Sequence, residues 1–187
     1  MNKELTCNEN CEECNQLEDA KISPIMVMGS ENRGILNAAS YILKLYQREK
    51  EEKYELKLKE MVPLFSQIER HYKKKEDLFL PIYSSYGFKD KVDEQIKQDN
   101  EILNLLKVIQ EKDKTLSPYD YKNLFLDFCT KIVLLAKEEN TNLLVYCFHN
   151  FTQDEMDEIG KKIPSYDYTF LSIKPKPEDL VSHKCSD

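Results

Sequence analysis

The sequence predicts an all-α protein in which four long amphipathic helices pack as an up-down-up-down bundle. Apolar residues recur at spacings of three and four along four stretches that short polar connectors separate. Only four glycines occur in 187 residues, and the paired turn residues that closely spaced strands need are scarce. This scarcity argues against an all-β fold and against a Gly-loop nucleotide fold. Long helices with short connectors are most simply arranged as a bundle.

The first helix is expected to begin at Ser23-Pro24, because serine caps helix N-termini and proline suits the first helical position. A charged connector ends it, and the second helix is expected over about 52–86. Pro63 and Pro81 interrupt the apolar stripe of the second helix, so they are expected to kink or shorten it. Gly87 is a suitable C-terminal stop.

The third helix is expected over about 89–113, and Ser117-Pro118 then repeats the start signal. The fourth helix is expected to extend from there to about 150. Thr152-Gln153-Asp154-Glu155 fits a capping box, in which side chains at both ends of the first turn bond to backbone amides. A short fifth helix is therefore expected.

Composition limits the partners and the compartment. The chain carries 27 basic and 34 acidic residues, and this net charge of −7 argues against nucleic acid or an anionic membrane as a partner. Its apolar runs are far shorter than the roughly 20 residues that span a bilayer, and no apolar export signal begins the chain. We expect a cytoplasmic protein with a cysteine-containing tail at 1–22, a bundle at 23–163 and a tail at 164–187.

Each long helix places an ionisable residue on or beside its apolar stripe. Glu31, Asp99 and Glu139 lie in line with core positions, Asp93 lies at the edge of its stripe, and His71 and Glu76 flank the stripe of the second helix. Buried carboxylates are costly unless they are paired or bound to metal. At 1.5 Å per residue, Glu31, His71, Asp93 and Glu139 fall within roughly 8 Å of one level, and Asp99 falls somewhat off it.

Two interpretations of these acids stay open. A carboxylate-rich site with His71 as its one imidazole would suit iron or manganese better than zinc or copper. Alternatively, a lysine can close a carboxylate into a salt bridge, and Lys75 lies near the middle of the second helix's apolar arc.

The segment from His71 to Pro81, HYKKKEDLFLP, resembles the hemerythrin-like (HHE cation-binding) domains, especially the variant often found beside PAS domains. The other segments of that variant follow in the same order across about 24–163. They are Glu31-Asn32-Arg33, Val92-Asp93-Glu94-Gln95-Ile96, Lys137-Glu138-Glu139-Asn140 and the capping turn Phe151-Thr152-Gln153-Asp154-Glu155-Met156.

The resemblance implies a four-helix bundle around a non-haem di-iron site, used by the family for oxygen, nitric-oxide or redox sensing, iron handling or oxygen binding. The ligand-bearing positions of the family match His71, Glu76 and Glu139. Asp93 lies where the family has His or Asp, and Glu31 matches a further position. The chain departs from the variant in two places. Met26 replaces a histidine, and Leu143-Leu144-Val145-Tyr146-Cys147 replaces a Leu-Phe-Pro ending. Three possibilities therefore stay open: one metal ion (iron or manganese), a weakly held pair of metal ions, or an inherited fold that binds no metal.

Cys7, Cys11 and Cys14 follow a C-x3-C-x2-C spacing, close enough to ligate one metal centre. Three cysteines leave such a site one ligand short. Both tails of an up-down-up-down bundle emerge at one end, so Cys185 or His183 is available as the fourth ligand. An iron–sulfur cluster, a zinc site and three free thiols are the alternatives. Cys129 and Cys147 fall on apolar stripes and are expected to fill the core.

Among function classes, the sequence favours a hemerythrin-like metal-binding sensor or redox-responsive protein for a small ligand such as oxygen or nitric oxide. No nucleophile and base occur at a recognisable spacing, so a catalyst is not expected. One alternative is a metal-free helical interaction or regulatory module whose acids are salt-bridged. Another is an iron–sulfur carrier that uses the cysteine tail. The sequence identifies no protein partner.

Overall fold

The structure is mainly helical in the residues that it describes. The computed structural model describes residues 22–46, 51–112 and 115–171, and within these ranges it contains helices and no β-strand. The helices of these ranges include none that is long and apolar enough to cross a membrane. The predicted all-α class is confirmed.

The predicted helix starts are confirmed at four places. Helix α2 spans Pro24–Tyr46, α6 spans Lys89–Lys112, α7 spans Pro118–Glu138 and α9 spans Gln153–Lys162. The Ser117 hydroxyl accepts a hydrogen bond from the Asp120 amide at 3.1 Å, which satisfies a free donor of the first turn of α7. At the start of α9, Thr152 and Glu155 form the expected capping box.

The second predicted helix is divided into several segments. Helix α3 spans Glu51–Phe65, α4 spans Ile68–Leu78 and α5 spans Leu80–Tyr83, and a π-helical turn follows at Ser84–Phe88. Pro63 lies inside α3 and the break comes only after Phe65, where the Ser66 hydroxyl donates to the Val62 carbonyl at 3.0 Å. Pro81 lies in the first turn of α5, where its missing amide hydrogen costs no helical hydrogen bond. Gly87 provides the stop with φ of 93°.

The fourth predicted helix contains a π-helical turn in its middle. Helix α7 continues through the turn at Glu139–Leu143 into α8, Leu144–Asn150. A π turn inserts one residue into the helix and therefore rotates the side chains that follow it. The turn begins at Glu139, which is one of the acids expected in the core.

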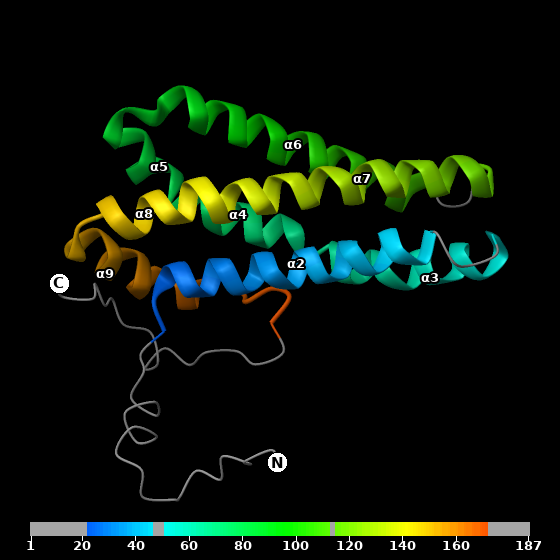
Figure 1. The fold of residues 1–187 in the computed structure, drawn as a ribbon, viewed down its shortest axis with the longest axis horizontal. Coiled ribbons are helices and arrows are strands. Elements are labelled where there is room, and N and C mark those ends of the chain that lie inside the picture. The colour runs from blue at the N-terminus through cyan, green and yellow to red at the C-terminus, as the bar shows by residue number, and fades with distance from the viewer. Residues whose placement is uncertain (1–21, 47–50, 113–114, 172–187) are drawn as a thin grey trace, which may run out of the picture.

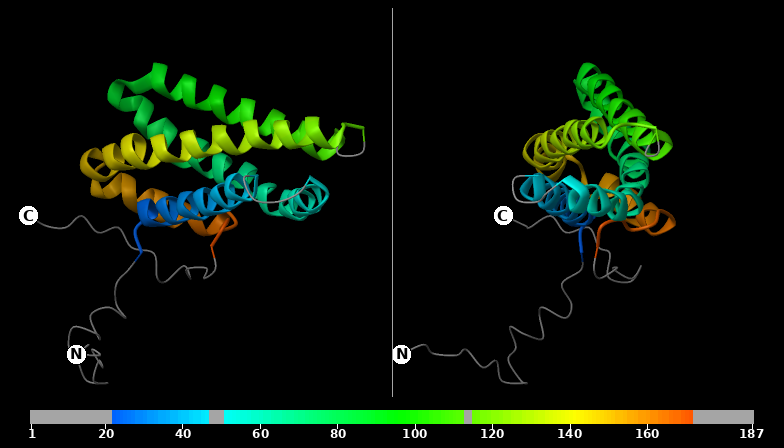
Figure 2. Two further views of the ribbon diagram at one scale, coloured as in Figure 1. Left: turned by 45° about the vertical axis from the view of Figure 1, so that its right-hand side comes forward. Right: turned by 90° about the vertical axis from the view of Figure 1, so that its right-hand side faces the viewer.

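The helices run in alternating directions along one long axis (Figure 1). Helix α2 packs on α7 and runs opposite to it, while α6 lies against α7 and α4. Viewed end-on in Figure 2, α2, α3, α6 and α7 surround a common axis, and α9 lies beside α2. This arrangement is compatible with the expected up-down-up-down bundle.

A layer of charged residues divides the core into two apolar clusters. The larger cluster lies toward the α3 end and includes Ile35, Tyr72, Ile102 and Ala136. The smaller cluster lies toward the α9 end and includes Met28, Leu78, Val92 and Leu143. On α2 and α6, and just after α7, one acid lies between members of the two clusters, and on α4 Lys74 and Lys75 lie between Tyr72 and Leu78. The residues of the layer are Glu31, His71, Lys74, Lys75, Asp99 and Glu139, each at most 1% exposed.

Residues 166–171 lie against α2 and α4. The Phe170 amide donates to the Gln67 side-chain oxygen at 3.1 Å, and the Phe65 and Phe170 rings are in contact. A Cβ atom added to Gly34 would lie 2.6 Å from the Phe170 carbonyl oxygen, so glycine is what allows this close approach. We call residues 166–171 the C-terminal strap.

Candidate functional site

His71, from α4, lies at the centre of the charged layer and bridges two carboxylates. Its Nδ1 lies 2.8 Å from Glu31 Oε2, and its Nε2 lies 3.3 Å from Glu139 Oε2. Burial alone would lower the pKa of His71, but the hydrogen bonds to Glu139 and Glu31 raise it above its usual value. Both ring nitrogens can then donate, so the imidazolium joins α2, α4 and α7 through one side chain.

Lys75 holds the other side of the layer. Its Nζ donates to Asp99 Oδ1 at 2.7 Å and to Glu139 Oε1 at 2.5 Å, with both lysine and aspartate fully buried. The ammonium also lies 4.6 Å from the centre of the Tyr72 ring, within cation–π range. Burial works to lower the pKa of Lys75, and Glu139 and Asp99 raise it above the usual value. Lys75 is therefore a buried cation shared by two helices.

Lys74 neutralises Glu31 from the same helix. Its Nζ lies 2.5 Å from Glu31 Oε1, and the Thr169 amide of the C-terminal strap donates to that oxygen at 3.0 Å. Burial lowers the pKa of Lys74, and Glu31 counteracts part of that effect. Burial would raise the pKa of Glu31, but His71 and Lys74 lower it below its usual value. The strap thus reaches the charged layer through one backbone amide.

The carboxylates of the layer differ in their environments. Burial would raise the pKa of Glu139, but Lys75 and His71 lower it to about 2. Burial raises the pKa of Asp99 to about 7 against the attraction of Lys75, and the Glu139 charge adds to the increase. Within the described ranges, Asp99 Oδ2 has no hydrogen-bond partner. With Asp99 ionised, three carboxylates face the three cations His71, Lys74 and Lys75, and the layer is electrically neutral.

Three of the five residues expected in a bundle metal site come together, and two do not. Glu31, His71 and Glu139 meet in the charged layer. Asp93 is exposed and lies 2.5 Å from the Lys89 ammonium, while Glu76 is half-buried. Asp99, which the axial count placed off the level, joins the layer instead. The buried stripe of α6 is Val92, Gln95, Asp99, Ile102, Leu106 and Ile109, so Asp93 points away from it.

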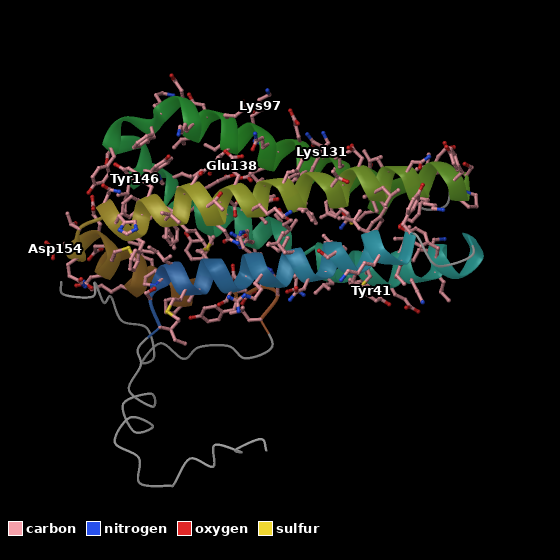
Figure 3. The ribbon with its side chains drawn as sticks, viewed as in Figure 1. Tyr41, Lys97, Lys131, Glu138, Tyr146 and Asp154 are labelled. Atoms are coloured by element: carbon pink, nitrogen blue, oxygen red, sulfur yellow. The ribbon has the colours of Figure 1, made fainter. Side chains whose placement is uncertain are left out.

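The two adjacent acids at the end of α7 have opposite environments. Glu139 is buried in the charged layer, whereas Glu138 lines a groove between α6 and α7 with Lys97 and Lys131 (Figure 3). Glu138 is therefore a natural control residue for Glu139.

Sequence reasoning overlooked Lys74 and Thr169. His71, Lys74, Lys75 and Leu78 follow the i, i+3, i+4, i+7 spacing of a buried helix face, so a count on this face could have found Lys74. Thr169 contributes a backbone amide from an irregular segment, and no sequence pattern signals such a contact. The overlooked contacts are thus one buried cation, Lys74, and one backbone amide, that of Thr169.

The side chains of the layer do not fit a metal centre in this arrangement. A histidine ligand directs one ring nitrogen at the metal, but both nitrogens of His71 face carboxylates here. The ammonium groups of Lys74 and Lys75 occupy the other oxygens of Glu31 and Glu139. Across the ranges 22–46, 51–112 and 115–171, no group of three or more His, Cys, Asp or Glu residues is arranged to hold a metal ion.

The cysteines divide between the core and the undescribed tails. Cys129 and Cys147 are fully buried, as expected for core-filling residues, and burial raises the pKa of the Cys147 thiol to about 12. Both are therefore protonated at neutral pH and poor nucleophiles. Cys7, Cys11, Cys14, His183 and Cys185 lie outside the described residues.

The charged layer predicts that stability falls as the pH rises through neutrality. The raised pKa of His71 gives a stabilising contribution that is complete below about pH 6.5 and is lost as the pH passes the folded-state value. Asp99, with its pKa raised to about 7, acts in the same direction, because its ionisation costs more in the folded chain. Glu31 and Glu139 have lowered pKa values, so their contribution is lost only in acid, below about pH 4.5.

We expect the thermal midpoint of the wild-type protein to decrease between about pH 6 and about pH 9, measured by circular dichroism. His71→Gln should lower the midpoint at acid pH and flatten this decrease. His149→Gln replaces an exposed imidazole on α8 and should give the same pH profile as the wild type. A wild-type profile for His71→Gln would contradict the charge assigned to His71.

The hemerythrin-like assignment remains a prediction that the sequence segments alone carry. The helical order and the meeting of Glu31, His71 and Glu139 are compatible with it. Comparison of the chain with protein-family models, with curated proteins and with solved structures finds no match.

Proposed function

We propose that this chain is a helical interaction module, built on a hemerythrin-like up-down-up-down four-helix bundle whose core acids are neutralised by lysine. The observation that carries the proposal is the position of Lys75 Nζ, which lies 2.7 Å from Asp99 and 2.5 Å from Glu139 in the buried layer. Lys74 makes the equivalent pair with Glu31. The inward acids of α2, α6 and α7 therefore have partners without a metal ion.

A charge-neutral layer gives the bundle a defined packing rather than a reactive centre. Buried ion pairs are poor sources of net stability, but removing one partner is costly, so they select the one register in which all partners meet. Glu31, His71 and Glu139 together fix α2, α4 and α7 relative to one another. A scaffold of this kind suits a protein that presents a fixed surface to a partner.

A non-haem iron or manganese sensor for oxygen or nitric oxide is the second candidate. It is favoured by the meeting of Glu31, His71 and Glu139, which are three of the ligand positions that the resemblance implies. In that case the two lysines would have to leave the carboxylates before a metal could bind. The second candidate therefore requires a rearrangement that the first does not.

The test measures metal and acid-labile sulfide in the full-length protein after anaerobic purification. The interaction module should contain neither in stoichiometric amount, and its thermal midpoint should not change on chelation or on addition of Fe(II) or Mn(II). A core metal that Glu139→Gln removes and Glu138→Gln retains would overturn the proposal in favour of the sensor. Iron with sulfide that Cys11→Ser removes would favour the iron–sulfur carrier.

A further inference from the structure

A groove on the surface between α2 and α8 has the features of a docking site. It encloses about 460 Å³, and Ile25, Met26 and Arg33 of α2 face Val145, Phe148 and His149 of α8 across it. None of these residues belongs to the charged layer. The role proposed above leaves this surface unassigned.

Three large apolar side chains are exposed around the groove. Met26 is 59% exposed, Val145 is 48% exposed and Phe148 is 44% exposed. They make up three of the eight exposed large apolar residues in the described ranges, although the groove occupies only a small part of the surface. Apolar side chains gathered at one place mark interaction surfaces, and methionine adapts its shape to a partner.

The floor of the groove is open because α2 carries small residues there. Gly29 and Ser30 line it, and a Cβ added to Gly29 would have Leu144 Cδ1 as its nearest neighbour, at 3.8 Å. The glycine is therefore not required by a close contact with α8. It leaves space that a side chain of a bound partner can fill.

The shape of the groove matches a short helix. Gly29 lies near Leu144, and the Asn32 side chain donates to Asn140 at 3.0 Å, so α2 and α8 are antiparallel along it. The lining extends from Ile25 to Leu36 on α2, which is about 16 Å at 1.5 Å per residue. This length accommodates about three turns of a helix, enough for anchors at i, i+4 and i+7.

The charge of the groove is opposite to that of the whole protein. Its lining contains Arg33 and His149 and no carboxylate, whereas the chain has a net charge of −7. Arg33 is exposed and makes no ion pair with the described residues. By the antiparallel register, Arg33 lies toward the Asn140 end of the groove and His149 toward the Met26 end. An acidic group on a partner helix would therefore be attracted to Arg33 at one end, and His149 can donate a hydrogen bond to a second one at the other end.

We propose that this groove binds an amphipathic helix of a partner protein, with apolar anchors on one face and acidic residues beside them. The proposal rests on the interaction role given above and identifies the partner's chemistry. The apolar anchors contact Met26, Val145 and Phe148 over the space at Gly29. The acidic residues pair with Arg33 and accept a hydrogen bond from His149, and they give the interaction its specificity.

The probe is a panel of stapled, fluorescently labelled helices with Leu, Met or Phe at i, i+4 and i+7 and Glu at both flanks. Fluorescence anisotropy with the full-length protein should show saturable binding of at least one member. Its twin with Lys in place of Glu should bind about tenfold more weakly, and added salt should reduce the difference. No binding by any member, or equal binding of both twins, would overturn the proposal.

Variants locate the binding on the groove. Arg33→Glu and Phe148→Asp should each weaken the acidic helix about tenfold, because each removes one class of contact. Lys107→Glu and Tyr119→Asp change exposed residues of the same kinds outside the groove and should bind as the wild type does. Equal loss in both groups would overturn the proposal, and circular dichroism verifies that each variant is folded.

Other occupants give different results, and each would overturn the proposal. A wild-type dimer that Phe148→Asp dissociates, measured by light scattering, would assign the groove to a second copy of the chain. Helix binding seen only after deletion of residues 1–21 would assign it to the chain's own N-terminal residues. The metal-free core, on which the proposed interaction role depends, is tested separately by metal content. Peptide binding can therefore fail while the charged layer is still found to contain no metal.

Discussion

Lys75→Met should destabilise the metal-free protein by about 3 kcal/mol, measured by urea unfolding followed by circular dichroism. Methionine has a similar length and fills the space of the lysine stem. It leaves Asp99 and Glu139 buried without the ammonium that contacts both of them. When one partner of a buried ion pair is removed, the desolvation cost of the other partner is no longer compensated. The loss should be smaller at acid pH, where Asp99 is protonated.

Lys73→Met is the matched control, because Lys73 lies on the same helix and its side chain is 67% exposed. Its pair with Asp77 is at the surface and screened by water and salt, so unfolding of this variant should coincide with that of the wild type. Equal effects of the two substitutions would show that Lys75 does not neutralise buried acids. A small effect at Lys75 with increased metal binding would support the iron or manganese sensor.

The helical architecture was largely predictable because local signals determined it. Ser117 and the Thr152–Glu155 box bond to the backbone amides of their own helix, so the sequence near each start contains the whole interaction. The breaks were harder to predict. Pro63 lies inside α3 and the interruption follows Phe65, while the π turn at Glu139–Leu143 carries no glycine or proline to indicate it.

The candidate site was predictable where a residue interrupts an apolar stripe. Glu31 and Glu139 were identified in this way, and the structure buries both of them. Asp93 was preferred to Asp99 as a site residue because its position along the helix axis matched the level of the other acids. The direction of the side chain, however, decides which of the two is buried. Asp93 follows the buried Val92 by one residue, or about 100°, and so faces Lys89 and solvent. Asp99 lies on the buried stripe and therefore meets Lys75.

The contribution of the C-terminal strap could not be predicted, because it depends on two backbone groups meeting across the fold. The Thr169 amide donates to Glu31 at 3.0 Å, and the Phe170 backbone passes over Gly34 on the next turn of α2. Neither contact is signalled in the sequence by a hydrophobic periodicity or by a spacing motif. A glycine inside a helix only indicates that something approaches closely there.

Gly34→Ala should therefore separate the strap from α2 and destabilise the protein by about 2 kcal/mol. The new Cβ would lie 2.6 Å from both the Cβ and the carbonyl oxygen of Phe170, so the backbone of the strap must move. That movement weakens the hydrogen bond from the Thr169 amide to Glu31. Hydrogen exchange should show faster exchange at Thr169, and urea unfolding gives the loss of stability.

Gly29→Ala separates the steric effect from the helix propensity of alanine. Gly29 lies on the same helix, but its added Cβ would be 3.8 Å from Leu144 and in ordinary contact. Alanine in a helix interior is favoured over glycine by about 0.5–1 kcal/mol, so this variant should be more stable than the wild type. Gly34→Ala has the same propensity gain and should still lose stability, because strap displacement outweighs it. A gain at both positions would show that the strap does not pack on α2.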